Sequence, residues 1–574
     1  MSGRAARHAP AGRLRANVGG APRCVAAALA ECSRWLSASV LLVLVGGLAL
    51  NVAGRLMGWP LVGANLLSAW LMPALAFAGL PQLMLGLDAG RARGFAATLI
   101  GAFALGVLVS GMTGAAFRVG GVEPVLGIPV GARFGVAAAG AALALALLAL
   151  GGWRGALAAS AGIGLVLAPV PALPAAAGLF IFCVGLFVRA PVALALIAAV
   201  GVSPGLLTDA ALAQNVMRGL SPSVLLAVPL FILSAALMLA GGVGARLAVG
   251  ARSLAGLRPS APGEANVWAS LLFGGVSASS VADAALAARL LAPPMVAAGY
   301  SPARAAAVSA SAAILPNVMP PSIALLLAAA ATDQSVGTLW FYGAFAALVL
   351  AAAMLVAVRL TPPDRADVAG EPVGRREAVG ALLPIAGLVA LILGALRLGV
   401  VTAVEAGVVA VLVALPFALR TGGMAGLRDA FVNAAGEAGR VALLIGAAAP
   451  VGFLLAVSGV SFADFVPLAG AAAVLAAALA LCLLVGTALD AGAAILLMLP
   501  VLVPAAAAAG VDPAHAALAM TIALIIGGLT PPVGILILVV KDVTGADGVY
   551  RAAIPYILAL VLGLALIAFV PLAI

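Results

Sequence analysis

The stretch "ILPNVMPPSIALLL", from Ile314 to Leu327, places three prolines inside an otherwise apolar run. A second stretch, "GGLTPPVGILIL" from Gly527 to Leu538, repeats this pattern far down the chain. Proline costs a helix interior about 3 kcal/mol, because it lacks the amide donor and clashes with the preceding turn. The two proline pairs therefore predict two broken helices.

The composition of the chain predicts that both breaks lie in a membrane. Of the 574 residues, 65% are hydrophobic and 8% are charged, and the mean hydropathy is +1.26. Apolar runs long enough to cross a bilayer recur along the chain, for example "LSASVLLVLVGGLALNVAG" from Leu36. We predict an all-α polytopic membrane protein with about 15–17 spans. A transmembrane β-barrel is excluded, because its strands would alternate in polarity over short segments.

The charged residues predict how the chain is oriented in the membrane, and the cysteines bear on disulfide and metal sites. The net charge of +10 comes almost entirely from arginine, and Lys541 is the only lysine. Basic residues ahead of the first span, opposed only by Glu31, predict a cytoplasmic N-terminus, because basic loops stay inside. The four cysteines are scattered, so neither a disulfide framework nor a metal site is expected. We expect membrane lipid around the protein, no nucleic-acid partner and no cofactor.

Apolar and polar stretches divide the chain into six parts. Four spans are expected near 36–53, 66–87, 95–117 and 131–151. The polar stretch "RLTPPDRADVAGEPVGRREAVG" separates two later apolar halves of similar length. The predicted parts are a basic cytoplasmic tail at 1–35, a four-helix region at 36–153, a linking helix at 154–173, a first repeat at 174–358, a polar loop at 359–380 and a second repeat at 381–574.

The two late halves share one order of events. In the first, "GGVSASSVADAA" from Gly274 to Ala285 is followed by Pro320-Pro321. In the second, "GTALDAGAA" from Gly486 to Ala494 is followed by Pro531-Pro532. Interrupted apolar segments at corresponding positions of two halves are typical of a transporter binding site.

Backbone chemistry explains why a transporter would break helices there. Hydrocarbon cannot satisfy freed carbonyls and amides, so a break survives only where protein, water or ions do so. Freed carbonyls suit a sodium ion, and freed amides at a helix N-terminus suit a carboxylate. Tight helix packing through small residues and simple proline kinks are the structural alternative. Asp283 and Asp490 favour a site, because a carboxylate deep in a membrane is costly and usually marks an ion or solute path.

Both halves resemble one family of membrane proteins. The segments "FGGVSASSVADAALAARLLAPPMVAAGYSPARAAAVSASAAILPNVMPPSIALLL" and "GTALDAGAAILLMLPVLVPAAAAAGVDPAHAALAMTIALIIGGLTPPVGILI" are similar to the large membrane subunit of tripartite ATP-independent periplasmic (TRAP) transporters. The resemblance covers about 174–574 in order. Region 36–153 is similar in size and span number to the small four-helix subunit of that family. One departure is Ser277-Ala278-Ser279, where the family usually has Ser-Gly-Ser.

The resemblance implies a secondary transporter of the bacterial inner membrane and not an enzyme. It would import organic acids, such as C4-dicarboxylates or related carboxylates, from a periplasmic solute-binding protein by sodium symport. The implied fold has an inverted repeat, two re-entrant helical hairpins, and transport and scaffold domains that move like an elevator. Sodium would lie near Ser277, Asn317, Thr487 and Thr530. The ion- and substrate-binding residues would be Ser277, Ser279, Asp283, Asn317, Pro320, Pro321, Ser322, Thr487, Asp490, Thr530, Pro531, Pro532 and Gly534.

Four other residues have two interpretations each. For His515, a surface or loop role is favoured over a proton relay. Glu405 and Glu437 fit buried functional acids or structural pairs with nearby arginines. Lys541 either faces an anionic solute or reaches to the membrane interface.

Three alternative functions stay open at this point. A membrane enzyme would need convergent acids, bases or metal ligands, and two histidines with few carboxylates supply no such set. A channel would line a continuous pore with polar rings, whereas the polar groups here gather at two breaks. The strongest alternative is an ion-coupled carboxylate carrier of a related superfamily that works without a binding protein.

Overall fold

The computed structural model describes residues 21–56, 64–84, 92–118, 132–150, 160, 175–187, 190–202, 208–274, 280–363, 374–458, 470–531 and 533–573. Every regular element in these residues is a helix, as predicted for an all-α membrane protein. The chain forms two compact units, one of residues 1–229 with 431–459 and one of residues 230–430 with 460–574.

The first unit contains the predicted four-helix region. Its helices are α2 (Ala21–Leu56), α3 (Ala64–Met84), α4 (Ala92–Arg118), α5 (Ala132–Leu150), α7 (Ala175–Phe187), α8 (Val192–Gly201) and α9 (Asp209–Gly219). Each of the four predicted early spans overlaps one of the first four helices, and these pack on one another. Gly140 lies so close to Phe77 that an added Cβ would be 2.7 Å from its side chain, which lets α5 approach α3.

The first helix begins earlier than the sequence predicts. Residues 21–35 belong to α2, whereas the sequence predicts a basic tail there. The segment contains no helix breaker after Pro22, and Glu31 pairs with Arg34 three residues later at 3.7 Å. The helix therefore extends well beyond its apolar part.

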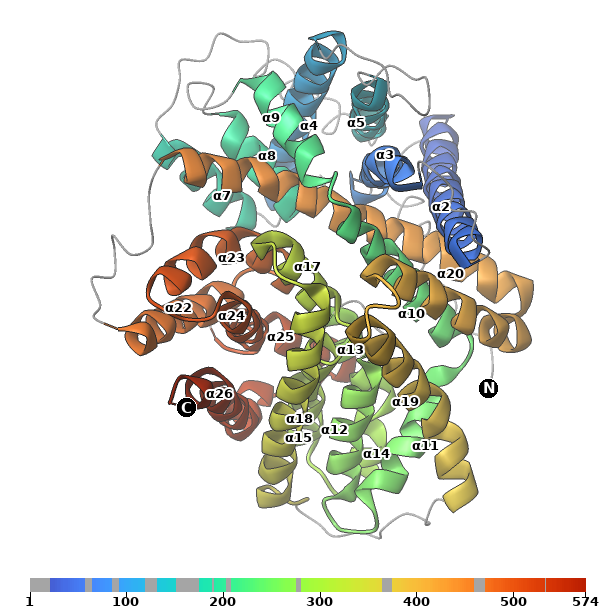
Figure 1. The fold of residues 1–574 in the computed structure, drawn as a ribbon, viewed down its shortest axis with the longest axis vertical. Helices are drawn as coiled ribbons and strands as arrows, with labels where there is room; N and C mark the ends of the chain where they lie inside the picture. The colour runs from blue at the N-terminus through green and yellow to red at the C-terminus, as the bar shows by residue number, and fades with distance from the viewer. Residues whose placement is uncertain are drawn as a thin grey trace. The chain divides into compact units, whose positions relative to one another are not determined.

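The second unit contains both proline breaks (Figure 1). In its first half, α10 (Ala227–Ala240), α11 (Val243–Ala255), α12 (Ala261–Phe273), α13 (Ser280–Leu290) and α14 (Ala292–Ala297) precede the break, and α15 (Pro302–Ala312), α16 (Leu315–Val318), α17 (Ile323–Thr332) and α18 (Val336–Leu360) surround and follow it. In the second half the order is α19 (Arg375–Arg397), α20 (Ala403–Ser458), α22 (Ala471–Gly486), α23 (Ala491–Ala508), α24 (Pro513–Gly527), α25 (Ile535–Thr544) and α26 (Val549–Ala573). Residues 431–458 of α20 belong to the first unit. Helix α20 is kinked at Gly423, where φ is 60°.

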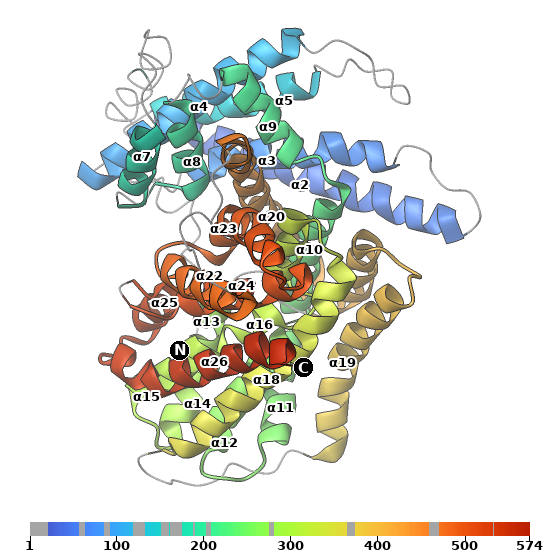
Figure 2. The ribbon, with the colours of Figure 1, turned by 60° about the vertical axis from the view of Figure 1, so that its left-hand side comes forward.

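The two halves end in equivalent long helices. Helix α18 follows the first break and α26 follows the second, and both have 25 residues. Figure 2 shows α26 beside α18, and the two helices are in contact. The Tyr556 hydroxyl and the Thr361 hydroxyl lie 2.8 Å apart and join them.

Six helices in the described part of the chain are long and apolar enough to cross a membrane, or seven if the bent pair around Pro320 counts as one span. Several further apolar helices have only 10–17 residues. The predicted number of 15–17 spans stays a prediction. The proposed linking helix at 154–173 lies outside the described residues, apart from Ser160.

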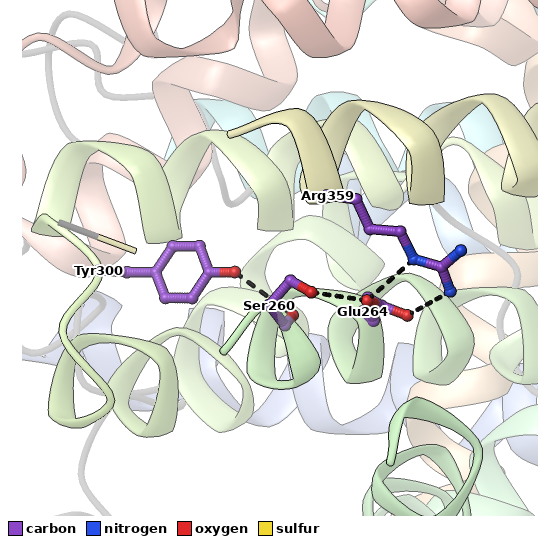
Figure 3. Close-up of polar contacts among 4 residues, drawn as sticks. All are labelled: Ser260, Glu264, Tyr300 and Arg359. Atoms are coloured by element: carbon purple, nitrogen blue, oxygen red, sulfur yellow. Dashed lines mark hydrogen bonds and ion pairs between the residues drawn. The ribbon is translucent and has the colours of Figure 1, made fainter. Parts of the chain in front are cut away.

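The polar loop between the halves is shorter than predicted, because helices occupy both of its ends. Arg359 lies in the last turn of α18 and α19 begins at Arg375. Figure 3 shows the reason at the first end. The Arg359 guanidinium donates to the buried Glu264 carboxylate from Nε at 3.1 Å and from Nη2 at 2.8 Å. The Ser260 hydroxyl donates to the same carboxylate at 2.7 Å, so this charge is fully partnered.

Candidate functional site

The first proline pair breaks a helix, as predicted. Helices α15 and α16 lead to it, α17 leaves it, and the axes on the two sides differ by 49°. This angle fits a broken span or a re-entrant loop, so the predicted hairpin at this break stays a prediction. The residues that form the break, Asn317 and Pro320 to Ser322, are all buried.

A hydroxyl replaces an amide that the prolines remove at this break. In a continuous helix the carbonyls of Pro316 and Asn317 would accept from residues 320 and 321, which are prolines and have no N–H. The Ser322 hydroxyl donates to the Asn317 carbonyl instead. The same hydroxyl caps α17 by accepting from the Leu325 amide at 3.1 Å.

The second proline pair also breaks a helix, between α24 and α25. The carbonyls deprived of donors here belong to Gly527 and Gly528. The Thr530 hydroxyl donates to the Gly527 carbonyl at 2.9 Å, and the Leu536 amide donates to the Gly528 carbonyl at 3.1 Å across the break. Gly534 begins α25 with a φ of 58°, a left-handed conformation that favours glycine.

The two breaks differ in exposure. Pro320 and Pro321 are buried, whereas Pro531 is exposed and Thr530 is half-buried. Pro532 lies outside the described residues.

The glycine that opens each polar segment lies against the break of the same half. Gly274 opens the first segment and lies against Met319, the residue before the first proline pair. Gly486 opens the second segment and lies against the Leu524 carbonyl and Gly527. Because Gly486 and Gly527 precede Thr487 and Thr530 closely, this contact places the two threonines on neighbouring helix ends.

The aspartates of the two segments both lie at helix N-termini. Asp283 is in the first turn of α13 and is 5% exposed. Asp490 is the N-cap of α23, and its carboxylate accepts from the Gly492 amide at 3.2 Å. This position stabilises a carboxylate through the free amides and the helix dipole. Helix capping is therefore an established role for Asp490, and its binding role stays a prediction.

Contacts between the halves cross over. Helix α13, from the first polar segment, packs on α25, which follows the second break. Helix α23, from the second polar segment, packs on α17, which follows the first break. This exchange is what a pair of related repeats that share one site would produce.

The chemistry at the breaks suits a hard cation. Thr487 is buried and donates its hydroxyl proton to the Leu484 carbonyl at 2.8 Å, which leaves its oxygen lone pairs free to accept. Thr530 donates in the same way to Gly527. No group of three or more His, Cys, Asp or Glu side chains able to hold a metal exists among the described residues. Sodium takes neutral oxygen ligands of the kind present here.

Comparison with known proteins agrees with this arrangement. Residues 179–573 match the family model "Tripartite ATP-independent periplasmic transporter, DctM component". The chain belongs to this family. It is 31% identical over 376 residues to the sialic acid TRAP transporter large permease protein SiaM of Vibrio cholerae, covering 62% of this chain and 87% of SiaM. It is 30% identical over 371 residues to the C4-dicarboxylate TRAP transporter large permease protein DctM of Pseudomonas aeruginosa, covering 60% of this chain and 84% of that one.

A third relative aligns over more of the chain. The isethionate TRAP transporter permease protein DctMQ of Oleidesulfovibrio alaskensis is 28% identical over 440 residues, covering 71% of this chain and 68% of DctMQ. This DctM-family chain is therefore a multi-pass membrane transporter and one component of a tripartite system, and it is not an enzyme.

The structure describes only some of the remaining predicted residues of this DctM-family chain. Ser277 and Ser279 lie outside the described residues. His515 is in the first turn of α24, where its Nε2 lies 2.9 Å from the Ala568 carbonyl, so its role is a helix contact. Glu405 caps α20 by accepting from the Thr402 amide at 2.7 Å. Lys541 pairs with the exposed Asp547 at 2.9 Å.

Sequence reasoning missed two features of the DctM-family chain. One is the Glu264–Arg359 pair, whose signal was a lone glutamate in an apolar run. The other is a second repeated motif, "GYSPAR" from Gly299 and "GVDPAH" from Gly510, at the same spacing ahead of each proline pair. Both glycines have a φ of 94°. Each motif starts a helix whose N-cap, Ser301 or Asp512, accepts from the amide three residues later.

Proposed function

We propose that this transporter imports organic acids, such as C4-dicarboxylates or related carboxylates, by sodium symport in the bacterial inner membrane. A periplasmic solute-binding protein would deliver the acid, and an elevator movement of the second unit's repeats would carry it across. The N-terminus would be cytoplasmic, because the basic residues precede the first span.

One observation supports this proposal most strongly. Both broken helices carry hydroxyl and carbonyl oxygens beside small-residue segments, and the helices of the two halves pack crosswise. Neutral oxygens suit sodium, and the adjoining helix N-termini of α17 and α25 suit a carboxylate. The named substrates of SiaM and DctM, sialic acid and C4-dicarboxylates, are carboxylates.

We also propose that residues 36–153 take the place of the small membrane subunit. Their four helices, α2 to α5, pack on one another within the first unit. The greater coverage of this chain by DctMQ than by SiaM or DctM supports this proposal.

Uptake into proteoliposomes, with candidate periplasmic binding proteins and radiolabelled organic acids, tests the proposal directly. We expect uptake to stop when choline replaces sodium at fixed pH and membrane potential. Undiminished uptake in choline would refute sodium coupling. Uptake at the same rate without any binding protein would favour the carrier that works alone.

Two sets of variants assign the ion to the breaks. Thr487→Val and Thr530→Val remove one oxygen ligand each, and we expect both to raise the sodium concentration for half-maximal uptake. Thr544→Val is the matched control, because its hydroxyl makes the same kind of bond to the Val540 carbonyl away from the break. Replacing Pro531-Pro532 with Ala-Ala should abolish coupled uptake, whereas Pro500→Ala, inside unbroken α23, should not.

A further inference from the structure

Each broken helix contacts the long helix that follows it at two places, one beside the proline pair and one at the start of the broken helix. In the first half the broken helix is α15 to α17 and the long helix is α18. In the second half the corresponding pair is α24 with α25, and α26. All of these elements belong to the second unit.

Beside each proline pair, an aromatic side chain of the long helix donates to the carbonyl of the residue immediately after the pair. The Trp340 indole, near the start of α18, donates to the Ser322 carbonyl at 3.1 Å. The Tyr550 hydroxyl, near the start of α26, donates to the Val533 carbonyl. Ser322 and Val533 occupy the same place relative to Pro320-Pro321 and Pro531-Pro532.

Each aromatic ring is itself held in place. Trp340 is fully buried and packs edge-on against Phe231 of α10, with ring centroids 5.2 Å apart. The Tyr550 ring lies against Gly534, where an added Cβ would be 2.9 Å from the ring. Each carbonyl is therefore contacted by a ring that itself packs against a neighbouring residue.

At the start of each broken helix, a side chain contacts a backbone carbonyl at the far end of the same long helix. Arg304 Nη1 donates to the Pro362 carbonyl, two residues beyond α18, at 2.6 Å. His515 Nε2 lies 2.9 Å from the Ala568 carbonyl in the last turns of α26, and it can donate both as the neutral Nε2–H tautomer and as the cation. Arg304 and His515 are the sixth residues of the motifs "GYSPAR" and "GVDPAH".

We propose that Arg304 and Trp340 are positioning residues that fix the first break against α18. His515 and Tyr550 fix the second break against α26 in the same way. The two halves use different side chains for the same two carbonyl contacts, so the fold repeats the contact and not the residue type. This inference rests on the proposed function only in assigning the ion to the breaks. A carbonyl that drifts from its ligand position weakens the site without touching the ion itself.

Tyr550→Phe is the sharpest variant, because it removes one hydroxyl and keeps the ring against Gly534. The Leu536 amide, which donates to Gly528 across the second break, reports whether the break has loosened. We expect hydrogen exchange in peptides that contain Leu536 to accelerate about 3- to 10-fold, the factor that the loss of one hydrogen bond gives. Tyr342→Phe is the control, because Tyr342 is an exposed aromatic of α18.

Transport supplies a second readout that misfolding alone would not move. In well-folded Tyr550→Phe, the sodium concentration for half-maximal uptake should rise about 3- to 10-fold, while loss of folded protein would lower only the maximal rate. Tyr550→Trp should restore the wild-type value, because Trp serves as the donor in the other half. His515→Arg should likewise retain it, and His515→Phe should not.

Unchanged exchange in folded Tyr550→Phe would overturn the proposal, as would accelerated exchange with an unchanged sodium requirement when the wild type depends on sodium. The exchange measurement needs neither sodium nor solute. If the wild type shows no sodium dependence, accelerated exchange in Tyr550→Phe would still support the positioning role of these contacts. The missing sodium dependence would then count against the proposed function only.

Discussion

Both proline breaks leave helix carbonyls without amide donors, but the surroundings of the two breaks differ. At the first break the prolines are buried, and a single hydroxyl, that of Ser322, serves both the Asn317 carbonyl and the Leu325 amide. At the second break Pro531 is exposed and the deprived carbonyls are shared between the Thr530 hydroxyl and two backbone amides. Removing the hydroxyl should therefore cost more stability at the first break than at the second.

The same contrast extends to charge. The first half buries Glu264 on α12 and pairs it with Arg359. The corresponding helix of the second half, α22, contains no charged residue. The first half thus has an ion pair on a helix whose counterpart in the second half carries no charge. Four predictions test the contrast, from the largest expected effect to the smallest.

The largest effect is expected for Arg359→Leu. It leaves the buried Glu264 carboxylate without the half-exposed guanidinium that partners it, and a buried carboxylate that loses its counter-charge is strongly destabilising. We expect the largest fall in Tm of the variants considered, measured by thermal unfolding in detergent. The double variant Glu264→Leu with Arg359→Leu should recover most of the loss, and a single variant with wild-type Tm would contradict a structural role.

The next largest effect is expected for Gly486→Ala. An added Cβ would collide with the Leu524 carbonyl and lie 3.1 Å from Gly527 Cα, so backbone would have to move. Overpacking of this kind costs about 1–3 kcal/mol. Gly394→Ala, in α19 with nothing within 4 Å of its Cβ, is the control and should be neutral or slightly stabilising. Equal Tm values for the two variants would refute the close approach of α22 and α24.

A smaller loss is expected for Ser322→Ala. It leaves the Asn317 carbonyl without the hydroxyl and removes the side-chain cap of α17 in a buried site. The free energy of unfolding should fall by about 1–2 kcal/mol, and Ser322→Thr, which keeps a hydroxyl, should lose less. Thermal unfolding of both variants checks this, and a wild-type Tm for Ser322→Ala would show that the break is satisfied in another way.

The smallest loss of stability is expected for Thr530→Val. The Gly527 carbonyl still accepts from the Thr530 amide at 2.9 Å, and the site is only half-buried. The free energy of unfolding should fall by about 1 kcal/mol or less. Because the same variant is expected to weaken sodium dependence, a large fall in Tm with normal sodium dependence would contradict both the lower stability cost expected at the second break and the ion site proposed there.

The sequence by itself determined the class of the protein and the place of its breaks. A proline has no amide hydrogen in any fold, so Pro320-Pro321 and Pro531-Pro532 each leave two consecutive helix carbonyls without their donors wherever the helices lie. Long apolar runs likewise fix a membrane protein, because water cannot solvate them. The repeated order of polar segment and proline pair marked the two halves without any knowledge of their packing.

Only the tertiary structure decided what surrounds each break. That Trp340 and Tyr550 perform one task follows from the carbonyls they contact, and no residue identity links them. That Glu264 meets Arg359 depends on helices α12 and α18 lying side by side, across many intervening residues. Local preferences act over a few residues along the chain, whereas these contacts are set by how whole helices pack, so the sequence could name the breaks but not their partners.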